Sequence, residues 1–120
     1  MNERVESILE HMLEDAEDVV DFIKGTESYE SFSQNKMQQK ATVMSLLNIG
    51  ELASQLPTEY KVAHSEIPWK NMIGMRNYAA HGYHAMSLDT IWATTQTSIP
   101  VLLTFLKSQL TSDAQNDDDK

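Results

Sequence analysis

Apolar residues recur at helical spacing along almost the whole chain. In the first segment the intervals are three and four, which places the apolar side chains on one stripe of a helix. This stripe consists of Val5, Ile8, Leu9, Met12, Leu13, Ala16, Val19, Val20 and Ile23. Gly25 follows where a helix commonly ends. The pattern predicts a long amphipathic helix, then a turn or single helical turn over 26–33 in which Tyr29 and Phe32 anchor to the core.

A second long helix is predicted over residues 35–56. Its expected buried stripe holds Met37, Ala41, Met44, Leu47, Leu52 and Leu56. Gly50 lies inside it, where glycine costs about 1 kcal/mol relative to alanine, and such a glycine indicates close approach of another helix. Pro57 ends the helix. Residues 58–66 then read as a loop with one helical turn around Tyr60.

Two more helices follow. The run Ile67-Pro68-Trp69 opens the third, with proline suited to a first helical turn, and Gly82 marks its end. Ser87 or Asp89 caps a fourth helix, inside which Pro100 predicts a kink or a break. Strand-like alternation and hairpin turn signals are absent from the sequence. The fold class predicted is all-α: an antiparallel up-down bundle of four long helices plus a short helix.

The 120 residues make one predicted domain over 1–110, with an acidic, disordered tail over 111–120. The chain has no cysteine, which fits a reducing cytosol, and no apolar run long enough to be a signal peptide or a membrane span. We therefore expect a cytoplasmic protein. The net charge of -9 counts against broad nucleic-acid binding and favours a basic partner protein or a small, focused anion site.

The candidate chemistry lies between Arg76 and Tyr83. Arg76 offers a fixed cation and His81 a group that titrates near neutral pH, which together can act on a phosphodiester without a metal. Five residues on a helix leave them about 140° apart, so they meet only if the helix ends near His81 or two subunits face each other. The simpler alternative is a surface arginine and a histidine bonded to a carbonyl. Tyr83 could bind phosphate or act as a nucleophile, or be an ordinary residue at the edge of the core.

Two further candidates need partners. His81 and His84 have the spacing of two metal ligands on one helical face. Asp89 lies nearby, but neither a Glu-x-x-His motif nor a cysteine accompanies them, and no metal site is predicted. Glu51 either faces solvent or is buried with a partner, and a carboxylate opposite Arg76 would orient the guanidinium. Phosphate-binding loops, serine-hydrolase elbows and EF-hand loops are absent from the sequence.

The run Ile67-Pro68-Trp69-Lys70-Asn71-Met72-Ile73-Gly74-Met75-Arg76-Asn77, followed by His81-Gly82-Tyr83, resembles the HEPN superfamily. The similarity is to the bacterial toxin branch encoded beside a minimal nucleotidyltransferase, and it covers about residues 4–110. Further agreement lies in Gly50-Glu51 and in Trp92 followed by Ile99-Pro100.

The resemblance implies a homodimer in which the arginine and histidine of both subunits meet in an interface cleft. It implies a toxin that is a metal-independent endoribonuclease, without a cofactor, and a partner nucleotidyltransferase that binds it as antitoxin and transfers AMP to the motif tyrosine. Carried over, Arg76 and His81 are catalytic, Tyr83 accepts AMP, and Asn77 matches the polar residue after the arginine. Two alternatives stay open: a non-enzymatic helical binding subunit of a nucleotidyltransferase complex, and a nucleotide-binding protein.

Overall fold

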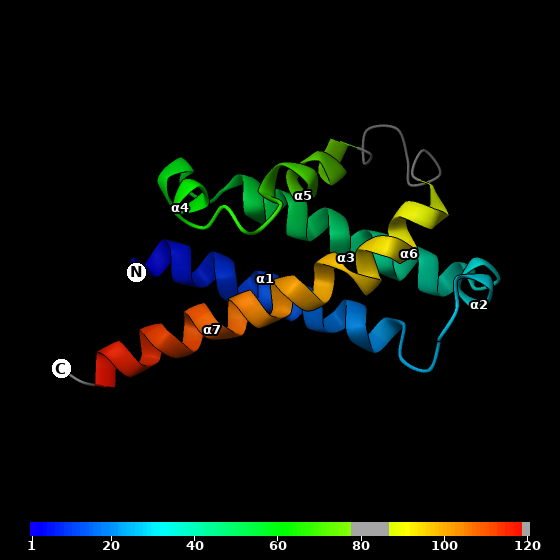
Figure 1. Cartoon of the computed structure of the whole chain (residues 1–120), viewed down its shortest axis with the longest axis horizontal. Helices are drawn as coiled ribbons and strands as arrows, with labels where there is room; N and C mark the ends of the chain where they lie inside the picture. The colour runs from blue at the N-terminus through cyan, green and yellow to red at the C-terminus, as the bar shows by residue number, and fades with distance from the viewer. Residues whose placement is uncertain (78–86, 119–120) are drawn as a thin grey trace.

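The computed structural model describes the backbone of residues 1–77 and 87–118, with side chains as far as residue 111. This part of the chain holds seven helices and no strand, which confirms the predicted all-α helical bundle (Figure 1). The helices are α1 (Glu3–Phe22), α2 (Tyr29–Ser33), α3 (Lys36–Ser54), α4 (Thr58–Ala63), α5 (Trp69–Met75), α6 (Leu88–Gln96) and α7 (Ser98–Asp118).

Side-chain caps set several helix starts. Asn2 accepts a hydrogen bond from the Val5 amide at 2.8 Å, and Asn35 accepts one from the Gln38 amide at 3.0 Å. Each cap satisfies an amide that the first turn of a helix leaves without a backbone partner. After α1, Gly25 adopts a φ of 85°, a left-handed conformation that glycine reaches without strain.

The break predicted near Pro100 is confirmed, and it falls three residues earlier. α6 ends at Gln96, Thr97 is its C-cap, and α7 begins at Ser98. Pro100 therefore lies in the first turn of α7, where its missing amide hydrogen costs no helical hydrogen bond.

The core forms where α1 packs against both α3 and α7, with α5 against α3 and α6 against α7 (Figure 1). Burying a branched aliphatic side chain contributes roughly 1.5–3 kcal/mol, so this core supplies most of the stabilisation. Its fully or almost fully buried members include Leu9, Met12, Ala16, Val19, Phe32, Ala53, Ile91 and Leu106.

The predicted buried stripe of α3 was wrong in part. Met37 and Met44 are 82% and 60% exposed, whereas the side chains facing α1 and α5 belong to a second stripe. That stripe consists of Gln39, Thr42, Val43, Ser45, Leu46, Ile49, Gly50 and Ala53. The small and branched side chains allow closer helix packing than a long thioether would, which turns both methionines outward.

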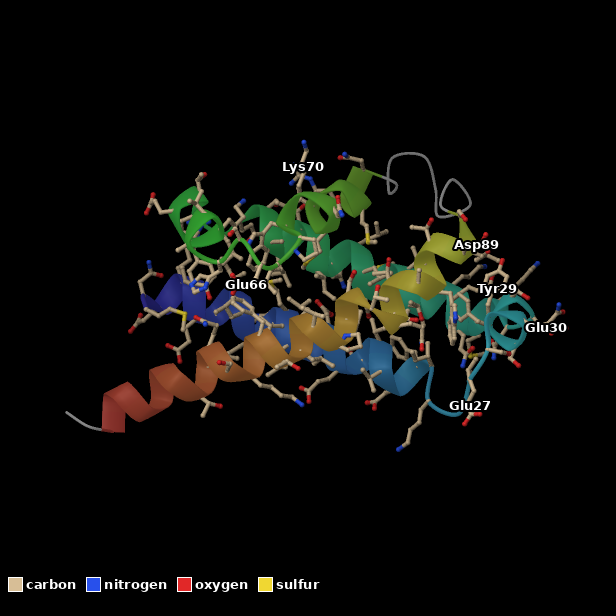
Figure 2. All side chains as sticks on the ribbon, viewed as in Figure 1. Glu27, Tyr29, Glu30, Glu66, Lys70 and Asp89 are labelled. Carbon is tan, nitrogen blue, oxygen red and sulfur yellow. The ribbon has the colours of Figure 1, made fainter. Side chains whose placement is uncertain are left out.

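The second correction concerns Tyr29. Phe32 is fully buried and packs on Trp92 with ring centroids 5.3 Å apart, as an anchor should. Tyr29 is 39% exposed instead, and its hydroxyl hydrogen-bonds Asp89 at the start of α6, beside it in Figure 2. That bond and partial burial raise the pKa of Tyr29. A tyrosine suits the edge of a core, because its ring can pack against apolar residues while its hydroxyl reaches a polar partner.

α7 continues to Asp118 and so takes in residues 111–118, which the sequence predicted as a disordered tail. The division of the chain into a domain and a tail stays a prediction. Within the described residues, none of the helices combines the length and the apolar character needed to cross a membrane.

Candidate functional site

The site begins with the contact between α3 and α5. Gly50 faces α5, and a Cβ added to it would overlap the carbonyl oxygen of Met72 and lie 3.4 Å from the backbone nitrogen of Arg76. Glycine therefore allows the backbone of α5 to lie directly on α3. The close approach predicted from the interior glycine is confirmed. It fixes the position of the α5 backbone, and with it the position of Arg76.

The other end of α5 is held by Trp69. Its ring is buried against Phe105, and its indole nitrogen donates a hydrogen bond to the carbonyl oxygen of His64 at 2.9 Å. Because both ends of this seven-residue helix are held against the bundle, the direction in which α5 points at its C-terminus is set by packing.

Arg76 caps the C-terminus of α5 and pairs with Glu51. The guanidinium nitrogen Nη1 lies 3.6 Å from the carboxylate oxygen Oε2, and the two side chains are 43% and 58% exposed. The pairing proposed from the sequence is thus present, in its solvent-facing form, and the buried form is wrong. At this distance it is an ion pair, so the guanidinium keeps donors and accessible surface for a ligand.

Of the remaining candidate residues, one lies within the described part of the chain and the others do not. Asn77 is exposed and directly follows Arg76 in a short 3₁₀ turn. His81, Tyr83 and His84 lie outside the described residues. The meeting of Arg76 with His81 therefore stays a prediction, and so does the role of Tyr83. Among the described residues there is no cluster of three or more histidine, aspartate and glutamate side chains suited to a metal ion.

An acidic hollow of about 350 Å³ flanks the ion pair on the α1 side. Its lining consists of His11, Glu14, Asp15, Asn48, Glu51 and Leu52. Burial, and then the charges of Asp18 and Glu14, raise the pKa of the Asp15 carboxyl, while a hydrogen bond with Asn48 opposes the shift. Sequence reasoning missed this neighbourhood, because nothing in the local pattern indicates which residues of α1 meet α3.

The stretch of sequence that contains α5 has the opposite charge. Residues 67–88 contain no aspartate or glutamate, and with histidines neutral Lys70 and Arg76 give them a charge of +2, so the rest of the chain carries -11. Lys70 is exposed and points away from the bundle in Figure 2. A run of 22 residues without an acid was visible in the sequence. The segment is positive because it lacks acids, so an acidic chain is compatible with a small anion site near Arg76.

The sequence over residues 12–109 matches the family described as "Ribonuclease HepT-like". Relatives include the protein named "Putative RNase TTE0752" of Caldanaerobacter subterraneus subsp. tengcongensis, 38% identical over 78% of this chain and 83% of its own. "Putative RNase MJ1380" of Methanocaldococcus jannaschii is 31% identical over 80% of this chain and 87% of its own. "Probable ribonuclease HepT" of Thermococcus cleftensis is 35% identical over 62% of this chain and 67% of its own. No solved structure matches the chain.

Proposed function

The chain belongs to the ribonuclease HepT-like family of the HEPN superfamily, and from this premise we propose that it is a metal-independent endoribonuclease and the toxin of a toxin–antitoxin pair. The observation that carries the proposal is the placement of Arg76. The chain has one other arginine, Arg4, and Arg76 alone lies in the acid-free segment, held partly exposed by Gly50 and Glu51.

The reaction we propose is attack of a ribose 2′-hydroxyl on the adjacent phosphorus. An imidazole of His81 takes the 2′-hydroxyl proton, and the bond from phosphorus to the 5′-oxygen breaks as that oxygen is protonated. The products are a 2′,3′-cyclic phosphate and a 5′-hydroxyl. Arg76 stabilises the charge that develops on the non-bridging phosphate oxygens through its fork of donors. Asn77 is a neighbouring polar group that can orient the same phosphate.

A homodimer completes the site in this proposal. Met37 and Met44 are exposed at a spacing of seven residues, and Glu51 lies seven residues further along the same face of α3. Exposed thioethers are adaptable apolar surface of the kind used at interfaces. A second copy bound across this face would bring two copies of Arg76 and His81 together around a twofold axis. One imidazole could then remove the proton and the other deliver it.

The regulation we propose is modification by a cognate minimal nucleotidyltransferase, the antitoxin, which transfers AMP to Tyr83. AMP adds bulk and negative charge to a site that must accept an RNA phosphate, so it blocks binding by occlusion and repulsion. The acidic remainder of the chain, at -11, favours docking of a protein with a basic surface.

The test uses the two arginines as a matched pair. Arg76→Ala and His81→Ala should each lower the rate of RNA cleavage by at least about 100-fold, as expected when a transition-state donor is removed, while Arg4→Ala keeps the rate. EDTA should have no effect, and the cleaved ends should carry 2′,3′-cyclic phosphates. Full cleavage and growth arrest by His81→Ala would overturn the proposal.

The alternative, a non-enzymatic binding subunit, gives a different result. It forms a stable complex with the nucleotidyltransferase and leaves RNA intact in both the wild type and the variants. Intact mass after incubation with the nucleotidyltransferase and ATP tests the modification, with Tyr83→Phe as the control that should not gain an AMP unit.

A further inference from the structure

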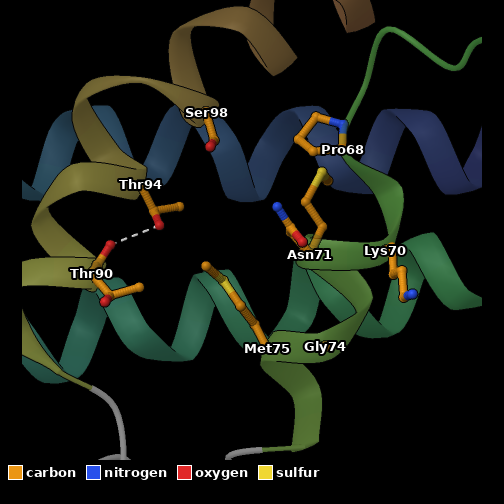
Figure 3. A pocket seen from close by; sticks show the side chains of 9 residues that line it. Pro68, Lys70, Asn71, Gly74, Met75, Thr90, Thr94 and Ser98 are labelled. Carbon is orange, nitrogen blue, oxygen red and sulfur yellow. Dashed lines mark hydrogen bonds between the residues drawn. The ribbon is translucent and has the colours of Figure 1, made fainter.

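A pocket of about 470 Å³ opens between α5 and the junction of α6 with α7 (Figure 3). It falls within the range of 300–1,000 Å³ typical of small-ligand sites. Its lining consists of Pro68, Lys70, Asn71, Met72, Gly74, Met75, Thr90, Thr94 and Ser98. It has no acidic wall, unlike the hollow on the other flank of Arg76.

The inner part of the pocket is apolar. Met72 and Met75 contribute thioethers, and behind them a small hollow of about 10 Å³ is closed by core residues, including Ile49 and Leu102. That hollow is too small for a further ligand group, so the pocket ends on packed hydrocarbon. Apolar walls that include two thioethers suit a planar ring, because thioethers make favourable contacts with aromatic systems.

The rim is polar, and several of its side chains have no hydrogen-bond partner among the described residues. The side-chain amide of Asn71 and the hydroxyls of Thr90 and Ser98 make no hydrogen bond to another described residue. Thr94 donates its hydroxyl hydrogen to the Thr90 carbonyl oxygen at 2.8 Å, which leaves its oxygen free to accept. An amide can both donate and accept, and hydroxyls do the same, which is the requirement for binding the edge of a heterocyclic base.

The pocket has open space beside Gly74. A Cβ added to Gly74 would meet no atom within 4 Å, in contrast to Gly50 on the neighbouring helix. The glycine therefore leaves space on the pocket wall that the packing of α5 on α3 does not need.

From these observations we propose that the pocket binds one nucleobase of the RNA substrate, next to the linkage that is cleaved. The inference rests on the proposed ribonuclease function. Met75 lines the pocket and Arg76 is the next residue, about 100° further around the helix, on the side of Glu51. An RNA strand lying across the last turn of α5 presents a phosphate to Arg76 and a neighbouring base to the pocket. Lys70, on the rim, faces the backbone of the same strand.

The first experiment locates binding directly. The full-length protein, with methionine methyl groups labelled with ¹³C, is titrated with each of the four ribonucleoside 5′-monophosphates. The methyl signals of Met72 and Met75 should shift because of the ring current of the bound base, while those of Met37 and Met44 should not. Gly74→Leu fills the pocket and Asn71→Ala removes the amide without filling it. Each variant should bind at least tenfold more weakly, and Ser108→Leu, an exposed change on α7, should bind as the wild type does.

The second experiment uses cleavage of RNA with randomised sequence. The wild type should prefer one or two bases at one position beside the cut, and Gly74→Leu should lose that preference. Unshifted Met72 and Met75 signals, in a protein that cleaves RNA with a preference unchanged by Gly74→Leu, would overturn the pocket and leave the ribonuclease function standing. Shifted signals with an unchanged preference, or in a protein that does not cleave RNA, would assign the pocket to a free nucleotide and overturn its role in RNA binding.

Discussion

At the scale of single residues, the best-defined feature is the pairing of Arg76 with Glu51. The pair is partly exposed, so it adds little to stability, and exposed ion pairs contribute about 0–1 kcal/mol. Its effect is on orientation, because a carboxylate at 3.6 Å limits the directions in which the long, flexible side chain of Arg76 can point. We therefore propose that Glu51 positions the Arg76 guanidinium.

We expect Glu51→Gln to lower kcat for RNA cleavage roughly tenfold, because a misdirected guanidinium stabilises the transition state less well. KM should stay the same or fall, since a negative charge near the phosphate is lost. Steady-state kinetics on a short RNA measure both values. Glu14→Gln is the matched control, because it removes a charge from the same hollow without touching Arg76. If both variants lower kcat equally, the effect is one of local charge and the positioning role is wrong.

A second residue-scale prediction concerns Asp15, whose pKa is raised above the ordinary 3.8 by burial and by neighbouring acids. The native state therefore favours the protonated form more than the unfolded state does. The stability gained from this is fully present below the unfolded pKa and is lost as pH rises through the folded pKa. Asp15→Asn should accordingly be more stable than the wild type at pH 7, by less than about 1 kcal/mol, since the carboxyl is only half-buried.

That difference should close as the pH falls below about 4, where the wild-type carboxyl is protonated in both states. Thermal unfolding at a series of pH values checks it. Glu10→Gln, a change to an exposed carboxylate on the same helix, serves as the control for the loss of one negative charge. An Asp15→Asn protein that is less stable than the wild type at pH 7 would show that the hydrogen bond with Asn48 outweighs the burial.

At the scale of helices, the contact between α3 and α5 sets the position of Arg76. Substitutions at two glycines, Gly50 and Gly74, test how close that contact is. Gly50→Ala should destabilise the protein by roughly 1–3 kcal/mol, because the new methyl group overlaps a backbone carbonyl that cannot rotate away. Alanine's better helix propensity, about 1 kcal/mol, offsets only part of this. The rate of RNA cleavage should fall as well, because the added methyl group displaces α5 and moves Arg76 away from Glu51.

Gly74→Ala is the same substitution in a helix with open space around it, and it should stabilise the protein by about 0.5–1 kcal/mol. Urea unfolding of both variants gives the comparison. A Gly50→Ala protein as stable as the wild type would mean that the helices pack less closely than the structure shows.

The helices themselves could be predicted from the sequence, because spacings of three and four leave little choice of secondary structure. Which face of α3 is buried could not. Met37 and Met44 lie on one apolar stripe and Val43, Leu46 and Ile49 on another, and periodicity does not rank two stripes. The choice depends on the surfaces of α1 and α5, which local sequence does not contain.

The same limit applied to the site. Gly50 indicated a close helix contact. Glu51 was considered as a partner of Arg76 because a carboxylate would orient the guanidinium, and the sequence did not show whether the two side chains meet. Asp15 and Asn48 were missed, since their meeting depends on how α1 crosses α3. The pocket beside α5 was missed for the same reason, because its walls come from segments more than ten residues apart.

At the scale of the whole molecule, charge is segregated and apolar surface is left exposed on one face of α3. Met44→Glu places a charge in the middle of that face. If the proposed dimer forms there, we expect the variant to be a folded monomer and RNA cleavage to fall at least about 100-fold. The reason is that a buried, unpaired carboxylate at an interface costs several kcal/mol, enough to prevent association. Sedimentation velocity, circular dichroism and a cleavage assay measure the three properties.

Val62→Glu is the matched control, because Val62 is 71% exposed and belongs to a different helix, α4. It introduces the same charge and should leave association and cleavage unchanged. A Met44→Glu protein that sediments as a dimer and cleaves RNA at the wild-type rate would place the twofold axis elsewhere. If Val62→Glu dissociates the dimer instead, the interface lies on the α4 side, and the two copies of Arg76 would not be brought together through α3.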